Sequence, residues 1–202
     1  MMDLFDSIED QQLPVVDAEI FLWRHVDFGK GKKLLDQLIE DTPWKSEPVT
    51  VWGKSYPQPR LVAWYGDEGK TYTYSSVAHH PLPWTATLLD LKNKVEELCE
   101  CGFNSVLLNY YRDHRDGVGF HADDEPELGR FPAIASVSFG ETRSFVMKHK
   151  CRKEQKDIKL QLPSESVLLM KGATQANWKH GIPKESRPCG PRVNLTFRNI
   201  LA

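Results

Sequence analysis

From residue 103 onward, the chain is an almost unbroken series of strand patterns, and this feature constrains the fold more than any other. Segments rich in β-branched and aromatic residues follow one another: FNSVLLNYYR, AIASVSFG, RSFVMKH, DIKLQL, SVLLMK and PRVNLTFRNI. Turn-forming residues separate them, namely Gly117, Gly140, Pro163, Gly172 and Pro183. Many short strands joined by such turns predict a barrel or a sandwich of β-sheets.

The last of these segments, residues 191 to 200, has two different faces. Side chains alternate along a strand, so Val193, Leu195 and Phe197 share one apolar face that packs into the protein. The opposite face carries two guanidinium groups, an amide and a hydroxyl, from Arg192, Asn194, Thr196 and Arg198. Such a polar face indicates either contact with solvent or the wall of an anion-binding site.

The first 102 residues contain two helix patterns with an aromatic-rich segment between them. GKGKKLLDQLIEDTPW predicts the first helix, and the apolar spacing after it predicts a second from about Pro83 to Cys101, with Pro83 in the first turn. The segment between them, VTVWGKSYPQPRLVAWYGDEGKTYTYSS, is typical of short strands and hairpins. We therefore expect a single α+β domain over residues 1–202, with residues 1–102 preceding a β-rich core over residues 103–202.

Composition excludes several classes of protein. The chain has 202 residues, 40% of them hydrophobic, and a net charge of −2, so its composition does not by itself indicate nucleic-acid binding, although a local basic patch can suffice. The four cysteines lack the CxxC spacing of a zinc site, and we expect them to be thiols in a reducing compartment. No run of 18 apolar residues is present, so we expect a soluble, intracellular protein without a membrane partner.

The string GVGFHADDEPELG contains a candidate metal site. His121 and Asp123 are two residues apart, so an extended backbone projects both side chains to one side. A second histidine has to complete the site, and the candidates are His25, His79, His80, His114, His149 and His180. Two histidines and a carboxylate form the facial arrangement of non-haem iron(II), and the same ligands also suit zinc.

An anion-binding pattern follows the last histidine and favours iron. Arg192 lies 12 residues after His180, and Arg198 lies six residues further on. Arginine forms paired, charge-assisted hydrogen bonds with carboxylates, as an iron co-substrate with two carboxylates such as 2-oxoglutarate requires. Asn109 and Tyr111 add a second period-two polar pair upstream of the HxD motif.

These motifs together resemble a known family. PRLVAWYGDEGKTYTYS, NYYRDHRDGVGFHADDEPELG, IASVSFGETRSF, GATQANWKHGIPKE and PRVNLTFR are similar to blocks of the AlkB-type iron(II)/2-oxoglutarate dioxygenases, in the same order. The likeness covers about residues 50 to 200 and is greatest for the second and third human homologues and their bacterial relatives. It implies a double-stranded β-helix, or jelly roll, with N-terminal helices and a nucleotide-recognition lid within residues 1–102.

The resemblance implies roles for individual residues of the catalytic core. His121, Asp123 and His180 correspond to the iron ligands. Arg192 corresponds to the arginine that pairs with the distal carboxylate of 2-oxoglutarate, and Arg198 to a catalytic arginine near its metal-chelating end. The same pocket is completed by Asn109, Tyr111 and Thr196.

The resemblance also implies contacts with a damaged base extracted from its stack. Asp124 corresponds to the acid that contacts the exocyclic amine, assisted by Glu125. The remaining positions correspond to a lid whose tyrosines stack on the base, a lid arginine, and a hairpin that probes the duplex, namely Tyr72, Tyr74, Arg60, Val51, Trp52 and Gly53. The basic segment KHKCRKEQKDIK predicts a hairpin that is either solvated or in contact with phosphates.

The implied reaction is oxidative dealkylation of N-alkylated bases such as 1-methyladenine and 3-methylcytosine in DNA repair. It needs iron(II), 2-oxoglutarate and O2, and it yields succinate, carbon dioxide and formaldehyde. The implied partner is alkylated DNA, single- or double-stranded, or RNA, and we expect the chain to be a monomer. The long basic N-terminal extension of some eukaryotic relatives has no counterpart here, so we expect a cytoplasmic, bacterial-type protein, or a nuclear one if the source is eukaryotic.

Two rival functions use the same residues differently. A hydroxylase or demethylase of the same fold that acts on RNA, a protein or a small molecule would share the iron and 2-oxoglutarate residues. It would not need the Trp52 hairpin or the tyrosine lid. A nucleic-acid-binding module without catalysis would be expected to lack part of the His121, Asp123 and His180 set, which is complete in this chain.

Overall fold

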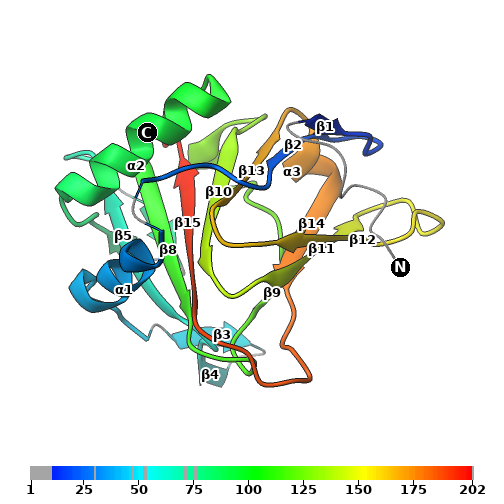
Figure 1. Cartoon of the computed structure of the whole chain (residues 1–202). Helices are drawn as coiled ribbons and strands as arrows, with labels where there is room; N and C mark the ends of the chain where they lie inside the picture. The colour runs from blue at the N-terminus through cyan, green and yellow to red at the C-terminus, as the bar shows by residue number, and fades with distance from the viewer. Residues whose placement is uncertain are drawn as a thin grey trace.

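The computed structural model describes residues 11–29, 31–46, 48–51, 54–70, 72–74 and 77–201 of the chain. Two antiparallel sheets dominate these residues (Figure 1). The larger has seven strands in the order β1 (Gln11–Leu13), β2 (Glu19–Trp23), β13 (Ser166–Lys171), β10 (Ile134–Gly140), β15 (Arg192–Arg198), β8 (Ser105–Tyr111) and β5 (Leu61–Gly66). The smaller has four, in the order β12 (Ile158–Leu162), β11 (Arg143–His149), β14 (Trp178–Ile182) and β9 (Val118–His121). The predicted jelly roll is thereby confirmed.

Two helices cover one face of the large sheet. Helices α1 (Gly31–Asp41) and α2 (Ala86–Cys99) lie on the same side of strands β8 and β15 (Figure 1). Their apolar side chains form one buried cluster with the outward-facing residues of β15, which are Val193, Leu195 and Phe197. This confirms the apolar face that period two predicts for the last strand, and it leaves the polar face directed to the opposite side of the sheet.

The second helix starts later than the sequence pattern predicts. A start near Pro83 is wrong, because Thr85 caps the helix by accepting a hydrogen bond of 3.2 Å from the backbone N–H of Leu88. The helix ends at Cys99 because Glu100 adopts a left-handed conformation with φ of 51°. Pro83 therefore lies before the helix and not in its first turn.

The short strands and hairpins predicted between the two helices are confirmed, and strands β1 and β2 add to the predicted set. The large sheet takes β1, β2 and β5 from the first 102 residues, in addition to the strands expected after residue 103. Two hairpins, β3 (Pro48–Val51) with β4 (Lys54–Pro57) and β6 (Tyr72–Tyr74) with β7 (Val77–His79), lie outside both sheets. The 3₁₀ turn η1 (Pro126–Leu128) follows β9, and the short helix α3 (Thr174–Asn177) immediately precedes β14.

The space between the two sheets is partly apolar and partly polar. An apolar cluster that includes Ile20, Phe145, Met147 and Trp178 fills part of it. A pocket in the same layer is lined by the polar face of β15 on one side and by β9, β11 and β14 on the other.

The basic segment after residue 147 joins β11 to β12, so the predicted hairpin is confirmed there. Within the described residues, no helix is long and apolar enough to cross a membrane.

Candidate active site

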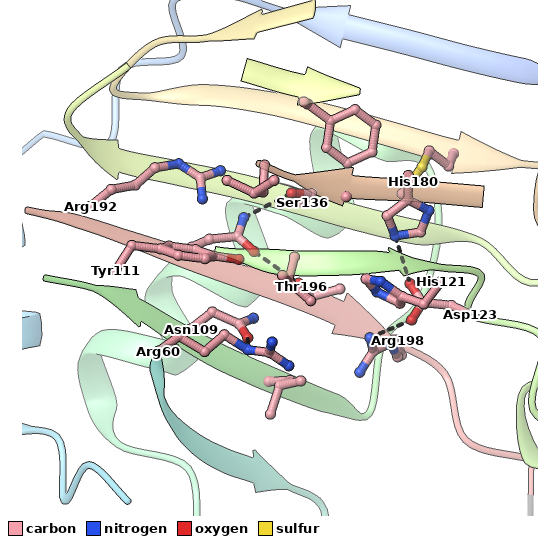
Figure 2. A pocket seen from close by; sticks show the side chains of 17 residues that line it. Arg60, Asn109, Tyr111, His121, Asp123, Ser136, His180, Arg192, Thr196 and Arg198 are labelled. Carbon is pink, nitrogen blue, oxygen red and sulfur yellow. Dashed lines mark hydrogen bonds and ion pairs between the residues drawn. The ribbon is translucent and has the colours of Figure 1, made fainter. Parts of the chain in front are cut away.

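Strand pairing brings two histidines and a carboxylate together. His180 of β14 lies directly opposite His121 of β9, and their ring centroids are 4.5 Å apart. A Cβ atom on Gly181 would lie 2.9 Å from the carbonyl oxygen of Val118, so the close approach of the two strands requires glycine there. Asp123 completes the cluster, in which the candidate ligand atoms all lie within 4.8 Å of one another (Figure 2). Such a cluster leaves positions open on a bound metal ion.

The imidazole of His121 is oriented for metal binding by a backbone contact. Its Nδ1 lies 2.9 Å from the carbonyl oxygen of Gly119, which can only accept a hydrogen bond. Nδ1 therefore carries the proton, and Nε2 keeps the lone pair that a metal needs.

Asp123 is almost completely enclosed, at 2% exposed, yet its surroundings favour the ionised form. Burial alone raises the pKa of this carboxyl, but the positive charge of Arg198, with smaller contributions from His180 and His121, outweighs burial and brings the pKa below its usual value. The NH2 group of Arg198 donates a hydrogen bond of 2.6 Å to Oδ1 of Asp123. A buried carboxylate that is already charged is suited to bind a cation.

His180 is held neutral by burial. Its pKa is lowered to about 4 because the enclosed site disfavours the imidazolium. The ring of Phe145 stacks on the imidazole, with centroids 5.2 Å apart and planes inclined by 21°. Neutral imidazole is the form that coordinates metal ions, so burial prepares His180 for that role at neutral pH.

Arg192 is a buried cation at the opposite end of the pocket (Figure 2). It is 1% exposed, and burial lowers its pKa to about 10, so the side chain is still charged at neutral pH. Its NH2 group donates to Oγ of Ser138 at 2.9 Å, whereas Nε and NH1 have no hydrogen-bond partner among the described residues. Isolated buried charge is costly, so this arrangement indicates a site for an anion.

Polar side chains line the wall between Arg192 and the histidines. The Arg192 guanidinium lies over the ring of Tyr111, with its Cζ atom 5.2 Å from the ring centroid. On β15, Oγ1 of Thr196 donates to Oδ1 of Asn194 at 3.0 Å, and both side chains line the pocket. Asn109 lines it as well and accepts a 2.8 Å hydrogen bond from Nε of Arg60. The structure thus brings the predicted iron and 2-oxoglutarate residues into one pocket.

The predicted base-contacting residues lie in several places. Asp124 is exposed and pairs with Nζ of Lys150 at 2.8 Å, outside the set of pocket-lining residues. Glu125 is half-buried and precedes η1, while Arg60 reaches into the pocket. Tyr72 and Tyr74 are described through the backbone of β6 alone, and Val51 through that of β3. Trp52 and Gly53 lie outside the described residues.

Sequence reasoning missed several residues of the site. Ser136 and Ser138 contact Asn194 and Arg192, and their period-two spacing against Val137 and Phe139 could have identified this polar face. Phe145, Lys150 and Gln175 gave no such signal, because they approach the site only through the packing of distant elements.

Comparison with known proteins is consistent with this geometry. A profile of the 2OG-Fe(II) oxygenase superfamily matches residues 29–198. The mouse alpha-ketoglutarate-dependent dioxygenase alkB homolog 3 is 45% identical over 183 residues, which is 87% of this chain and 63% of that protein. The mouse DNA oxidative demethylase ALKBH2 is 39% identical over 201 residues, covering 89% of this chain and 84% of that protein. The chain thus spans less than two thirds of the length of its alkB homolog 3 relatives.

A solved structure supports the fold independently of close sequence identity. The structure of OsALKBH1 superposes with a TM-score of 0.64 at 16% identity, covering 94% of this chain and 99% of the other. Because the superfamily profile spans most of the chain and its relatives share well over 30% of its residues, this chain belongs to the 2OG-Fe(II) oxygenase superfamily and, within it, to the AlkB-type proteins.

Proposed function

We propose that this chain is an iron(II)- and 2-oxoglutarate-dependent dioxygenase that removes alkyl groups from N-alkylated bases in DNA. The observation that carries the proposal is the pocket between the sheets, which has a His-Asp-His cluster at one end and the buried cation of Arg192 at the other. The name of the ALKBH2 relatives, DNA oxidative demethylase, supports DNA as the substrate class.

The His-Asp-His cluster has the donor set and the geometry that suit iron(II). His121, Asp123 and His180 would hold the ion, with the imidazole of His180 neutral and the carboxylate ionised. Arg198 binds Oδ1 of Asp123 and leaves Oδ2 on the side of His180. Oδ2 lies 3.8 Å from Nε2 of His180. One carboxylate oxygen is therefore oriented by the arginine and the other is available to the metal.

The anion end suits the distal carboxylate of 2-oxoglutarate. Nε and NH1 of Arg192 are donors without a hydrogen-bond partner among the described residues, and a carboxylate accepts strong, charge-assisted hydrogen bonds from a guanidinium. Asn109, Tyr111 and Thr196 line the stretch toward the metal ligands, and Arg198 stands at the metal end. A dicarboxylate with one end at Arg192 and the other at the metal end of the pocket would supply the negative charge that the buried Arg192 cation lacks.

When bound, iron(II) with 2-oxoglutarate and O2 supplies the oxidation of the alkyl group, with succinate, carbon dioxide and formaldehyde as products. The residues of the chain bind and orient the reactants and exclude water from the pocket. The buried side chains of Phe145, Met170 and Ile182 form the apolar part of the pocket wall. The protein thereby directs the oxidation to one C–H bond of the substrate.

The proposed preference is for bases that carry a positive charge, such as 1-methyladenine and 3-methylcytosine. Asp124, beside the metal-binding Asp123, provides an exposed carboxylate for the exocyclic amine or the charge of such a base. Glu125 follows it, and the lid tyrosines Tyr72 and Tyr74 are proposed to stack on the extracted base.

The test is demethylation of defined oligonucleotides, followed by mass spectrometry. The protein is incubated with iron(II), ascorbate and 2-oxoglutarate and with single-stranded DNA, duplex DNA or RNA that contains one 1-methyladenine. We expect loss of 14 mass units, the difference between a methyl group and a hydrogen atom, from DNA, and none with the variant His121→Ala. No mass change on any DNA substrate would overturn the proposed activity, and turnover confined to RNA would overturn the proposed substrate class.

A further inference from the structure

The backbone of the metal-binding Asp123 is held by a side chain from a distant element. The N–H of Asp123 donates a 3.0 Å hydrogen bond to Oε1 of Gln175, which is 52 residues away in the sequence. Gln175 is 1% exposed and belongs to the four-residue helix α3. An amide N–H buried without a partner costs about 1–3 kcal/mol, so this contact fixes the position of the Asp123 backbone.

Lys150 also connects helix α3 to Asp124, the residue that follows Asp123 in the loop. Nζ of Lys150 donates 2.8 Å hydrogen bonds both to the backbone oxygen of Gln175 and to Oδ2 of Asp124. The backbone N–H of Lys150 also donates to the carbonyl of Asn177 at 2.7 Å. The segment Asp123–Asp124 is therefore attached to α3 through both the side chain and the main chain of one residue.

Helix α3 links these hydrogen bonds to the second histidine of the metal site. The helix ends at Asn177, and β14, which carries His180, starts at the next residue. Thr174 anchors the start of the helix by donating to the backbone oxygen of Lys171 at 2.6 Å and accepting from the N–H of Glu19 at 2.9 Å. A helix held in this way fixes the strand bearing one ligand and the loop bearing another relative to each other.

We propose that Gln175 is a positioning residue for the metal centre, whose side-chain oxygen sets the distance between the Asp123 carboxylate and the imidazole of His180. Gln175 is not among the residues that line the pocket, and it acts through the backbone of Asp123. Groups that orient metal ligands in this way typically change metal affinity by 10- to 100-fold when they are removed. The inference rests on the metal-ligand roles proposed above.

The test measures binding of Ni²⁺ alone by isothermal titration calorimetry, so that it does not depend on turnover. Gln175→Met keeps the size of the side chain and removes the acceptor, and we expect it to weaken Ni²⁺ binding about tenfold. Gln175→Glu keeps an oxygen of the same reach, and we expect its Ni²⁺ affinity to be no weaker than that of the wild type. Equal affinity of Gln175→Met and the wild type would overturn the inference. Absence of Ni²⁺ binding by the wild type would instead count against the proposed metal site.

Asn177→Leu is the matched control from the same helix. The Asn177 side chain donates to the backbone oxygens of Asp17 and Ala173, and neither belongs to the metal cluster. We expect this variant to lose stability in urea denaturation while its Ni²⁺ affinity stays within twofold of the wild type. An equal fall in affinity for both variants would mean that α3 acts only through general stability, and the positioning role would be wrong.

Hydrogen exchange in the wild-type protein gives a test that needs no substitution. We expect the backbone amide of Asp123 to exchange slowly in the metal-free protein, because Gln175 and not the metal protects it. Solution NMR of the chelated protein measures this rate directly. Fast exchange at Asp123 that slows only after Zn²⁺ is added would overturn the inference.

Discussion

Arg198 and Asp123 form the closest charged contact in the pocket, with NH2 and Oδ1 2.6 Å apart and side chains only 12% and 3% exposed. The contact occupies one carboxylate oxygen and leaves Oδ2 on the side of His180, at 3.8 Å. One arginine thereby keeps a buried carboxylate ionised without covering the oxygen that faces the histidines. Each side chain depends on the other, because burial disfavours either charge by itself.

Replacing Arg198 should reveal that dependence. We expect Arg198→Met to lower the free energy of unfolding of the metal-free protein by about 3 kcal/mol, because the Asp123 carboxylate is left buried without its cation. Urea denaturation with a chelator measures the loss. The double variant Arg198→Met/Asp123→Asn is the control and should recover part of the stability. If the single variant is as stable as the wild type, the charge pair does not stabilise the fold.

Replacing Arg192 should separate ligand binding from stability. Arg192→Met removes both free donors, and we expect the 2-oxoglutarate concentration for half-maximal succinate formation to rise about 100-fold, the effect of about 3 kcal/mol of charge-assisted hydrogen bonding. DNA binding measured by fluorescence anisotropy should change far less. The ligand-free variant should also unfold at a higher temperature than the wild type, because a buried cation without an acidic partner has been removed.

A matched substitution tests whether charge alone is enough at this position. Arg192→Lys keeps a cation but loses the planar pair of donors, so it should recover only part of the affinity for 2-oxoglutarate. An unchanged requirement for 2-oxoglutarate in both variants would exclude Arg192 from the co-substrate site.

The buried imidazole of His180 predicts a pH dependence of stability. Its pKa in the folded protein is about 4, below the ordinary value of 6.5, so the unfolded chain binds the proton more readily between these values. The contribution of neutral His180 to stability is therefore fully present above pH 6.5. In the metal-free protein, the free energy of unfolding should fall by roughly 3 kcal/mol as the pH decreases toward 4. His180→Gln should remove most of this slope in urea denaturation at a series of pH values. A slope of the same size in the variant would assign the effect to other groups.

Asp124 should matter for substrate and not for stability. Its ion pair with Lys150 involves a carboxylate side chain that is 57% exposed, so Asp124→Asn should change the free energy of unfolding by less than about 1 kcal/mol. On oligonucleotides with 1-methyladenine, we expect kcat/KM to fall about tenfold, through loss of the charge facing a cationic base. Formation of succinate without DNA should be unchanged. Equal kcat/KM for variant and wild type would remove Asp124 from the proposed base contacts.

Trp52 provides a prediction about strand preference. The residue comes between β3 and β4 in the sequence, at the position that the family resemblance assigns to the duplex-probing hairpin. An indole that wedges into a vacated base position assists only with paired substrates, so Trp52→Ala should lower activity on duplex DNA more than on single strands. Mass spectrometry of both substrates under the same conditions compares the two losses. Equal losses would argue against a probing role.

The sequence alone determined the two faces of the last strand. Val193, Leu195 and Phe197 pack under the helices, and Arg192, Asn194, Thr196 and Arg198 face the pocket, as period two predicts. The prediction was accurate because the alternation of side chains is a local property of extended backbone. The HxD motif identified His121 and Asp123 as candidates, but β9 ends at His121, and Asp123 lies in the loop that follows, where Gln175 and Arg198 hold it. The order of the motifs then indicated the family.

Tertiary structure decided which distant residues meet at that face. The choice of His180 as the second histidine depends on the register between β9 and β14, which no local pattern encodes. Gln175 reaches Asp123 across 52 residues and Arg60 reaches Asn109 across 49, each through packing of separate elements. The same holds for β1, β2 and β5, which join the large sheet from the first half of the chain. Local periodicity specifies the direction of a side chain relative to its own strand, whereas its partners depend on how the sheets and loops pack together.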